Sequence, residues 1–206
     1  MKKNSSFYIC FFIILISMFF GVAISSVHFT TLAMLKKNET LHKNRIISKA
    51  FMLDVKGDSP KAYQEAVTKN INIDVISIKN QKIKIFKDKK RGNIGFLFKG
   101  MGFWEPISGI IVLESNLKQV INIQILEQKE TPGLGARIEE KWFTDQFKNL
   151  NIDWKSKDKK IIVGSGGKKK NNSVDGITGA TQTSMALMKI LNDDLKKFKK
   201  FYKSKG

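Results

Sequence analysis

The sequence has few of the residues that bind metals or form disulfides. Its single cysteine, Cys10, excludes a disulfide within the chain and every multi-cysteine metal site or cluster. The two histidines, His28 and His42, lie in or near the N-terminal segment. A histidine-based metal site and a Ser-His-Asp triad are therefore excluded from the folded domain. No residue has the setting of a catalytic acid, base or nucleophile.

Acidic residues are also scarce, with 18 Asp and Glu against 37 Lys and Arg, which gives a formal net charge of +19. Such a charge permits attraction to anionic lipid, acidic proteins or nucleic acid. The lysines are dispersed, however, and the clearest cluster, Lys168-Lys169-Lys170, is short. Because no nucleic-acid motif accompanies the charge, a lysine-rich solvated surface is predicted and nucleic acid is not expected as a partner.

The long apolar run lies near the N-terminus. Lys2 and Lys3 precede a run from Phe7 through Ile24, which continues more weakly through Leu35. A helix needs about 20 apolar residues to cross a bilayer, so residues 1–35 are predicted to be a cytoplasmic N-terminus and a transmembrane anchor. A cleaved signal peptide is the competing interpretation, because the small residues Ala23 and Ser25 lie at plausible cleavage spacing.

The rest of the chain predicts an α+β fold, a single domain with a mainly antiparallel sheet and flanking helices. Residues 36–58 are predicted to be a polar linker, and the domain to span 59–206. Ser59-Pro60 is a typical helix start for 61–70. Alternating apolar and polar residues predict strands at 71–78 and 82–87. Further strands are predicted at 94–98 and 159–163 and, as a hairpin, at 107–113 and 119–126.

Two helices are predicted later in the chain. The first spans 136–147, with Ile138, Trp142 and Phe147 on its buried side. The second is long and amphipathic, because its apolar residues recur at steps of three and four. These residues are Met185, Met188, Leu191, Leu195, Phe198 and Tyr202. Glycine-rich segments at 99–106 and 164–168 lack the spacing of nucleotide-binding loops, and 164–168 is interpreted as a basic loop.

Two short motifs point to a ligand. Asp175-Gly-Ile-Thr-Gly-Ala-Thr181 precedes the long helix, where free N–H groups and the positive end of the helix dipole suit a phosphate. Taken alone, the spacing favours an ordinary helix cap. The other motif, Glu130-Thr-Pro-Gly-Leu-Gly135, is a rigid loop that suits packing against a flat ring, although as bare sequence it is only a strand-to-helix turn.

Together the two motifs resemble the signatures of the covalent FMN-binding domain family, from about Gly95 to the helix behind Thr181. In that family a flavin transferase joins the FMN phosphate to the last threonine of D-x-x-T-G-A-T. The resemblance implies a phosphoester of FMN on Thr181. The other cofactor-binding residues that it implies are Asp175, Thr178, Gly179, Ala180, Glu130, Thr131, Gly133, Leu134 and Gly135. Family members often have a histidine shortly before the glutamate, where this chain has Gln128.

The resemblance also implies a function. Family members are small flavoprotein subunits of membrane complexes of the ferredoxin:NAD or NADH:quinone oxidoreductase type. The chain is thus predicted to relay electrons through FMN in a respiratory, ion-translocating complex, and not to be catalytic alone. The partners implied are other membrane subunits, a flavin transferase and membrane lipid. The implied location is the inner membrane, single-pass, with the domain on the extracytoplasmic side.

Two alternatives remain open on the sequence. A free-standing flavinylated carrier outside the cytoplasm would share every site residue and differ only in its partners. A basic, membrane-anchored binding module without cofactor would use the motif at Thr181 only as a helix cap. Bound flavin would exclude the binding module without cofactor. Co-purifying membrane subunits would distinguish a subunit of a complex from a free-standing carrier.

Overall fold

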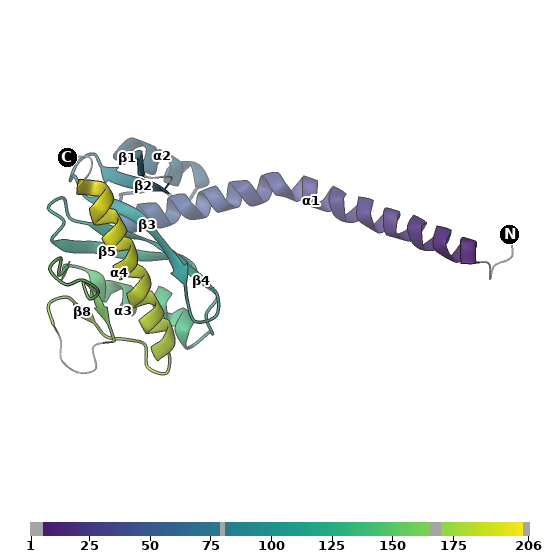
Figure 1. Ribbon diagram of the computed structural model, residues 1–206. Helices are drawn as coiled ribbons and strands as arrows, with labels where there is room; N and C mark the ends of the chain where they lie inside the picture. The colour runs from purple at the N-terminus through teal and green to yellow at the C-terminus, as the bar shows by residue number, and fades with distance from the viewer. Residues whose placement is uncertain (1–5, 79–80, 165–169, 204–206) are drawn as a thin grey trace. The chain divides into compact units, whose positions relative to one another are not determined.

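The computed structural model describes residues 6–78, 81–164 and 170–203 (Figure 1). The contacts within the chain divide it into two compact units, Met1–His42 and Lys43–Gly206. Helix α1 (Ser6–Ala50) begins in the first unit and ends in the second. The second unit contains the sheet, the remaining helices and both sequence motifs.

Helix α1 has the length and composition of a membrane-spanning helix. At about 1.5 Å per residue, its apolar part alone is long enough to cross a bilayer. The side chains of this part are exposed, among them Phe7, Phe19 and Ile24. A signal sequence near an N-terminus has the same properties, so the anchor stays a prediction.

The end of α1 is part of the core of the second unit. Ile47, Ala50 and Phe51 are buried there against apolar residues of the next helix and of the sheet. The Phe51 ring lies directly over Gly95, where a Cβ atom would be 2.7 Å from the ring. A polar linker was predicted for 36–58, but the helix continues to Ala50 and its last turns supply core residues. Burial of these residues depends on a sheet that is distant in sequence.

A polar cluster holds the end of α1 to the start of α2 (Pro60–Asn70). The Tyr63 hydroxyl and the Arg45 guanidinium each donate to Asp58 Oδ1 at 2.6 Å. These two hydrogen bonds lower the pKa of Asp58. The cluster therefore stabilises the fold above the ordinary pKa of an aspartate and loses this effect as the pH falls below it. The contribution is small, because the groups are exposed.

Six antiparallel strands form the main sheet, in the order β1-β2-β3-β4-β5-β6. They are β1 (Ile71–Ile78), β2 (Gln81–Asp88), β3 (Ile94–Met101), β4 (Pro106–Leu113), β5 (Gln119–Glu127) and β6 (Leu150–Asn151). A parallel pair, β7 (Ile162–Val163) and β8 (Ser173–Val174), lies apart from this sheet. The predicted α+β fold with a mainly antiparallel sheet is confirmed, as is the helix start at Ser59, whose hydroxyl accepts from Ala62 N.

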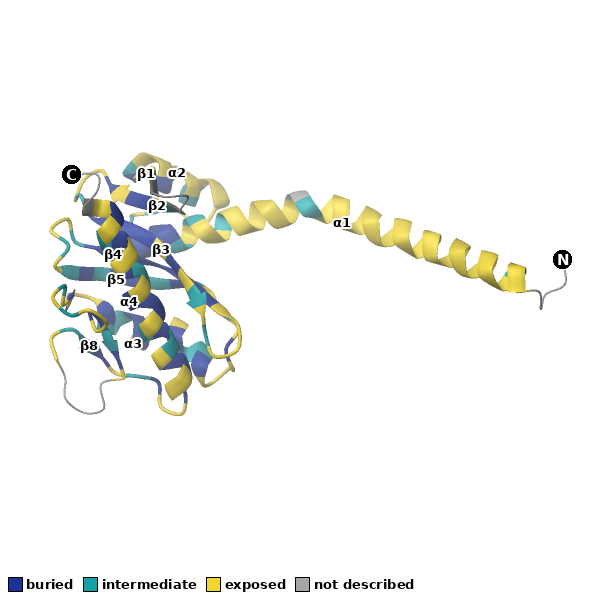
Figure 2. Cartoon of the chain, in the orientation of Figure 1, coloured by how far each residue is buried: buried dark blue, intermediate teal, exposed yellow. Residues whose placement is uncertain are grey.

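Helix α4 (Thr181–Lys203) covers one face of the sheet. Figure 2 shows its buried inner side and its exposed outer side. On the inner side, the Phe198 ring stacks on Phe96 of β3 with 4.6 Å between the centroids. The end of α1 packs against the other face. The long helix behind the Thr181 motif is therefore fixed to the sheet along its length.

Two helix predictions need correction. The segment 136–147 is not one helix but three short pieces, η1 (Gly135–Glu139), α3 (Lys141–Thr144) and η2 (Asp145–Phe147). The tighter 3₁₀ turns change which side chains face the core. Phe143 is therefore buried, and Trp142, predicted to be buried, is 41% exposed. On α4, Leu187 is buried and Met185, the first residue of the predicted apolar stripe, is 52% exposed.

Near the end of the chain, the predicted strand at 159–163 is reduced to β7. The basic loop predicted at 164–168 lies outside the described residues except for Gly164.

A chain shortened to begin at Lys43 is expected to retain the stability of the domain, whereas one that begins at Ser59 is expected to lose about 3 kcal/mol or more. The reason is that loss of a buried Phe side chain costs about 3–5 kcal/mol, and the shorter chain lacks Phe51 and Ile47. Urea unfolding followed by tryptophan fluorescence measures the difference. Phe51→Ala in the longer form is the matched control, and equal stability of all forms would contradict a core role for the end of α1.

Candidate functional site

Glu130 is the centre of the site. Its side chain is buried, at 4% exposure, between three segments that are distant in sequence. Oε1 accepts hydrogen bonds from the backbone N–H groups of Phe103 at 2.8 Å and Trp104 at 3.2 Å. Oε2 accepts from the Thr183 hydroxyl at 2.8 Å. The carboxylate therefore joins the loop after β5 to the turn between β3 and β4 and to the first turn of α4.

This arrangement suits a buried carboxylate, because charge-assisted hydrogen bonds from fixed donors replace water. The backbone of Glu130 is held as well, since its N–H donates to Gln128 Oε1 at 2.7 Å. Among the residues predicted to bind the cofactor, Glu130 thus lies beneath the surface and positions its neighbours. The contacts of Glu130 with Phe103, Trp104 and Thr183 were not predicted, because they join segments with no local pattern in common.

The Glu130–Gly135 loop is closed tightly. The Thr131 carbonyl accepts hydrogen bonds from the N–H groups of Leu134 and Ala136, both at 3.1 Å. Gly135 is required by close packing, because a Cβ atom there would lie 2.5 Å from the Thr183 hydroxyl oxygen. Thr131, Gly133 and Leu134 are exposed at the surface of the loop. The loop is therefore fixed from below and presents its outer side to solvent.

The two motifs lie in contact. Gly179 has a φ of +79°, and a Cβ atom at this position would lie 3.1 Å from Leu134 Cδ2. Asp175, Thr178 and Gly179 are exposed, whereas Ala180 is buried. The Asp175 N–H donates to Gln146 Oε1 at 2.9 Å, which links the loop to η2. The structure thus brings together the two sequence motifs that the resemblance assigns to one site.

Thr181 is the first residue of α4, and its side chain is exposed. The first backbone hydrogen bond at this end runs from Ser184 N to Ala180 O at 3.1 Å. The N–H groups of 181–183 therefore precede the hydrogen-bonded ladder, as at any helix start. These donors and the helix dipole favour an anion next to Thr181. The exposed Thr181 hydroxyl and the free N–H groups of 181–183 together fit the phosphate of FMN.

Ser184 fixes the loop before Thr181 from inside. Its hydroxyl accepts from the Ile177 N–H at 3.0 Å and donates to the Ala180 carbonyl at 3.1 Å. Its side chain is buried at 2% exposure. The sequence shows only that Thr183 and Ser184 follow the motif. Their inward position becomes predictable once Thr181 is known to be the first helical residue, because the core-facing side of α4 continues to Leu187.

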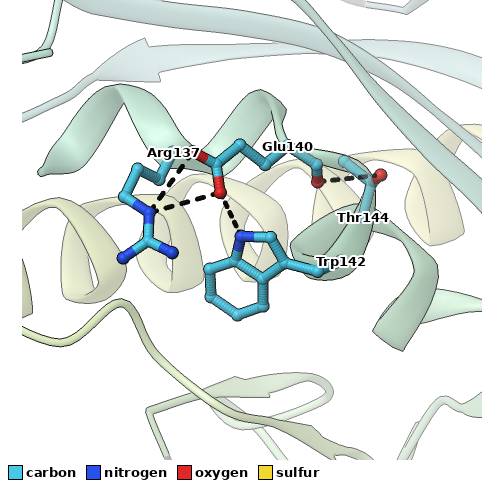
Figure 3. A network of polar contacts seen from close by, with 4 residues as sticks. All are labelled: Arg137, Glu140, Trp142 and Thr144. Carbon is cyan, nitrogen blue, oxygen red and sulfur yellow. Dashed lines mark hydrogen bonds and ion pairs between the residues drawn. The ribbon is translucent and has the colours of Figure 1, made fainter. Parts of the chain in front are cut away.

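Exposed aromatic and apolar side chains surround the site. Phe103 and Trp104 are 51% and 62% exposed and meet edge to face at 4.9 Å. Behind the Glu130 loop, Trp142 is held at the surface by the network shown in Figure 3. Its indole N–H donates to Glu140, and the Arg137 guanidinium lies 5.1 Å from its ring centroid. Since these contacts satisfy its polar atom outside the core, they account for the exposure of Trp142.

A groove of about 550 Å³ lies beside α4. We call it the α4 groove. Its residues come from the turn after β3, the segment before β7 and one side of the helix, which is exposed at Gln182 and Met185 and buried at Asn192. They are Gly102, Phe103, Lys157, Asp158, Lys159, Gln182, Met185, Ala186, Met188, Lys189, Asn192, Asp193 and Lys196.

The segment that holds the two joined motifs is similar to a known domain family. Residues 102–196, which include both motifs, match the sequence model of the FMN-binding domain family. The resemblance read from the motifs is thereby confirmed.

Named relatives are subunits of ion-translocating complexes. The chain is 34% identical over 87 residues to the C subunit of the Na(+)-translocating NADH-quinone reductase of Vibrio alginolyticus, a match that covers 41% of this chain and 34% of the relative. It is 31% identical over 122 residues to the G subunit of the ion-translocating oxidoreductase complex of Buchnera aphidicola, a match that covers 52% and 57%. The chain thus aligns with about a third to a little over half of the length of these relatives.

Solved structures share the fold. The crystal structure of the C subunit of the Na(+)-translocating NADH-quinone reductase from Parabacteroides distasonis has a TM-score of 0.70 at 24% identity, covering 82% of this chain and 94% of that chain. NqrC of Shewanella oneidensis has a TM-score of 0.65 at 16% identity, covering 75% and 91%.

Proposed function

We propose that this chain is an electron-carrying flavoprotein subunit that bears FMN as a phosphoester on Thr181. The observation that carries the proposal is the setting of the hydroxyl groups around the motif. Thr183 and Ser184 are buried and their hydroxyls are engaged within the protein. Thr178 and Thr181 are exposed, and only Thr181 stands at the first turn of α4. The family match and the anion-favouring helix start support the same residue.

The protein contributes attachment and orientation, and the FMN ring supplies the redox chemistry. When the phosphoester forms, Thr181 Oγ1 loses its proton and bonds to the phosphorus of the flavin donor. The bond from that phosphorus to the rest of the donor breaks, and the rest of the donor leaves. Asp175, Thr178, Gly179 and Ala180 shape the approach to the attachment point. Thr131, Gly133, Leu134 and Gly135 form the neighbouring loop, which Glu130 holds in place. A tethered flavin cannot diffuse away, so it can serve repeatedly as a carrier.

The proposal includes a place for the chain in a membrane complex. Relatives named as subunits of translocating complexes support other membrane subunits as partners, and the apolar part of α1 supports a single-pass anchor in the inner membrane with lipid around it. The domain is proposed to lie on the extracytoplasmic side. Its boundaries are proposed to be an anchor over 1–35 and a folded domain that begins at Lys43, earlier than the predicted 59.

Production of the chain with and without an active flavin transferase tests the proposal. Only the first preparation is expected to give a band that remains fluorescent after denaturation, because a phosphoester survives unfolding. Purification from native membranes is then expected to bring other redox subunits with it, whereas a free-standing carrier would be isolated alone. A dark band in both preparations would contradict the covalent attachment.

A further inference from the structure

The α4 groove begins beside the proposed attachment point. Residues spaced by three or four on a helix share a face, so Thr181 lies on the side of α4 that continues through Met185 and Met188, both in the groove. The rise from Thr181 to Met185 is about 6 Å and to Lys189 about 12 Å, at about 1.5 Å per residue. A flexible polyol chain separates the phosphate of FMN from its ring. A group attached at Thr181 can therefore reach into the groove.

The wall opposite the helix is held in position by Asn192. Its Oδ1 accepts from the N–H groups of Lys160 at 2.7 Å and Ile161 at 3.2 Å. Its Nδ2 donates to the carbonyls of Ile161 and Met188, both at 2.7 Å. The Lys160 ammonium is directed inward and donates to the carbonyls of Ser156 at 3.2 Å and Lys157 at 2.6 Å, and burial lowers its pKa. The segment 157–159 is therefore fixed to α4.

The remaining wall is fixed by Glu130. The same carboxylate binds the Phe103 N–H and the Thr183 hydroxyl of α4, so the Phe103 side of the groove and the helix have a common support. A groove with rigid walls on both sides is a preformed site, as is usual for small-molecule ligands. Its volume of about 550 Å³ lies within the range of such sites.

The residues of the groove suit a flat ring that becomes negatively charged, because they combine apolar surface with positive charge. Phe103, Met185 and Ala186 offer apolar and aromatic surface, and Gln182 offers a polar amide. Four lysines line the groove against two carboxylates. The lysines are Lys157, Lys159, Lys189 and Lys196, and the carboxylates are Asp158 and Asp193. Lys189 pairs with Asp193 at 3.3 Å. The other three lysines stand against one further carboxylate, Asp158, so the groove has an excess of two positive charges.

We infer that the α4 groove binds the ring of the FMN attached to Thr181 and that its lysines favour the reduced flavin. This inference rests on the function proposed above. The oxidised ring is neutral, and uptake of two electrons and one proton leaves the reduced ring with one negative charge. Nearby cations lower the free energy of the charged form more than that of the neutral form. The groove therefore makes the reduction potential of the flavin more positive.

A triple variant, Lys157→Gln, Lys159→Gln and Lys196→Gln, tests this inference. The matched control is Lys56→Gln, Lys69→Gln and Lys90→Gln, which removes the same charge from a separate cavity near α2. Spectroelectrochemical titration of the flavinylated protein measures the potential. The groove variant is expected to reduce the equilibrium constant for reduction at least tenfold, about 30 mV for a two-electron couple, and the control to change it much less. The difference should shrink at high salt.

Equal potentials of the two variants, on protein that carries covalent flavin, would overturn the inference and leave the proposed function intact. Absence of flavin from the unaltered chain would instead refute the proposed function. The position of the flavin ring is tested separately by Ala186→Trp, whose larger side chain fills the groove. Displacement of the ring into solvent is expected to increase the quenching of flavin fluorescence by acrylamide, and unchanged quenching would contradict a ring in the groove.

Discussion

Thr181→Ala is expected to abolish covalent flavin while the domain remains folded. The residue is exposed, and among the described residues its hydroxyl has no hydrogen-bond partner. Its removal should therefore change the free energy of unfolding by about 0.5 kcal/mol or less, as for other surface substitutions. This is less than the cost of about 1 kcal/mol expected for a helix cap. Flavin fluorescence of the denatured protein and the urea midpoint of the native protein are measured on the same preparation.

Two neighbouring substitutions make this test specific. Thr178→Ala removes the other exposed hydroxyl of the motif and is expected to retain the flavin, although at reduced efficiency if the transferase reads this position. Thr181→Ser keeps a hydroxyl at the attachment point and is expected to restore part of the labelling. Full fluorescence of the Thr181→Ala variant would show that another residue is the acceptor.

Glu130→Ala is expected to destabilise the domain by about 3 kcal/mol or more. Three donors lose their acceptor at a buried position, and each unsatisfied buried group costs about 1–3 kcal/mol, with incomplete additivity where water enters. Because the same carboxylate supports two walls of the α4 groove, any flavin that is attached should also be more accessible to solvent. Urea unfolding measures the first effect and acrylamide quenching the second.

The matched control is Glu130→Gln. The amide oxygen can still accept from Phe103 and Trp104, and its NH₂ group can donate to the Thr183 hydroxyl oxygen. The glutamine variant is therefore expected to lose clearly less stability than the alanine variant, the difference reporting the shape and polarity of the side chain rather than its charge. If both variants unfold at the urea midpoint of the unaltered protein, Glu130 does not hold the site together.

Local patterns in the sequence predicted most of the sheet. Alternation over 71–78 and the hairpin pattern of 107–113 and 119–126 identify strands, because each strand pairs with one that is next to it in sequence. Trp142 was misplaced because the prediction assumed one continuous helical period, and 3₁₀ turns on both sides of α3 break it. The linker was misplaced because Ile47 and Phe51 lie among polar residues in the sequence. These two side chains become buried only when the segment packs against the folded sheet.

Part of the candidate site could be predicted from the sequence. The motifs predict Thr181 as the attachment point with the Glu130 loop beside it, and the structure places these two segments in contact. The support of the site was not predictable, because Glu130 and Thr183 are 53 positions apart and meet only through the fold. The same is true of the α4 groove, whose walls come from three separate segments. Sequence thus indicates the attachment chemistry, while the structure indicates what surrounds it.

The most direct test of the account is the mass of the tryptic peptide that covers 171–189, from protein made with an active flavin transferase. This peptide contains five hydroxyl residues, namely Ser173, Thr178, Thr181, Thr183 and Ser184. The account predicts a peptide heavier by one FMN unit, with fragment ions that place the added mass on Thr181. An unmodified peptide, or an added mass on any of the other four residues, would contradict it.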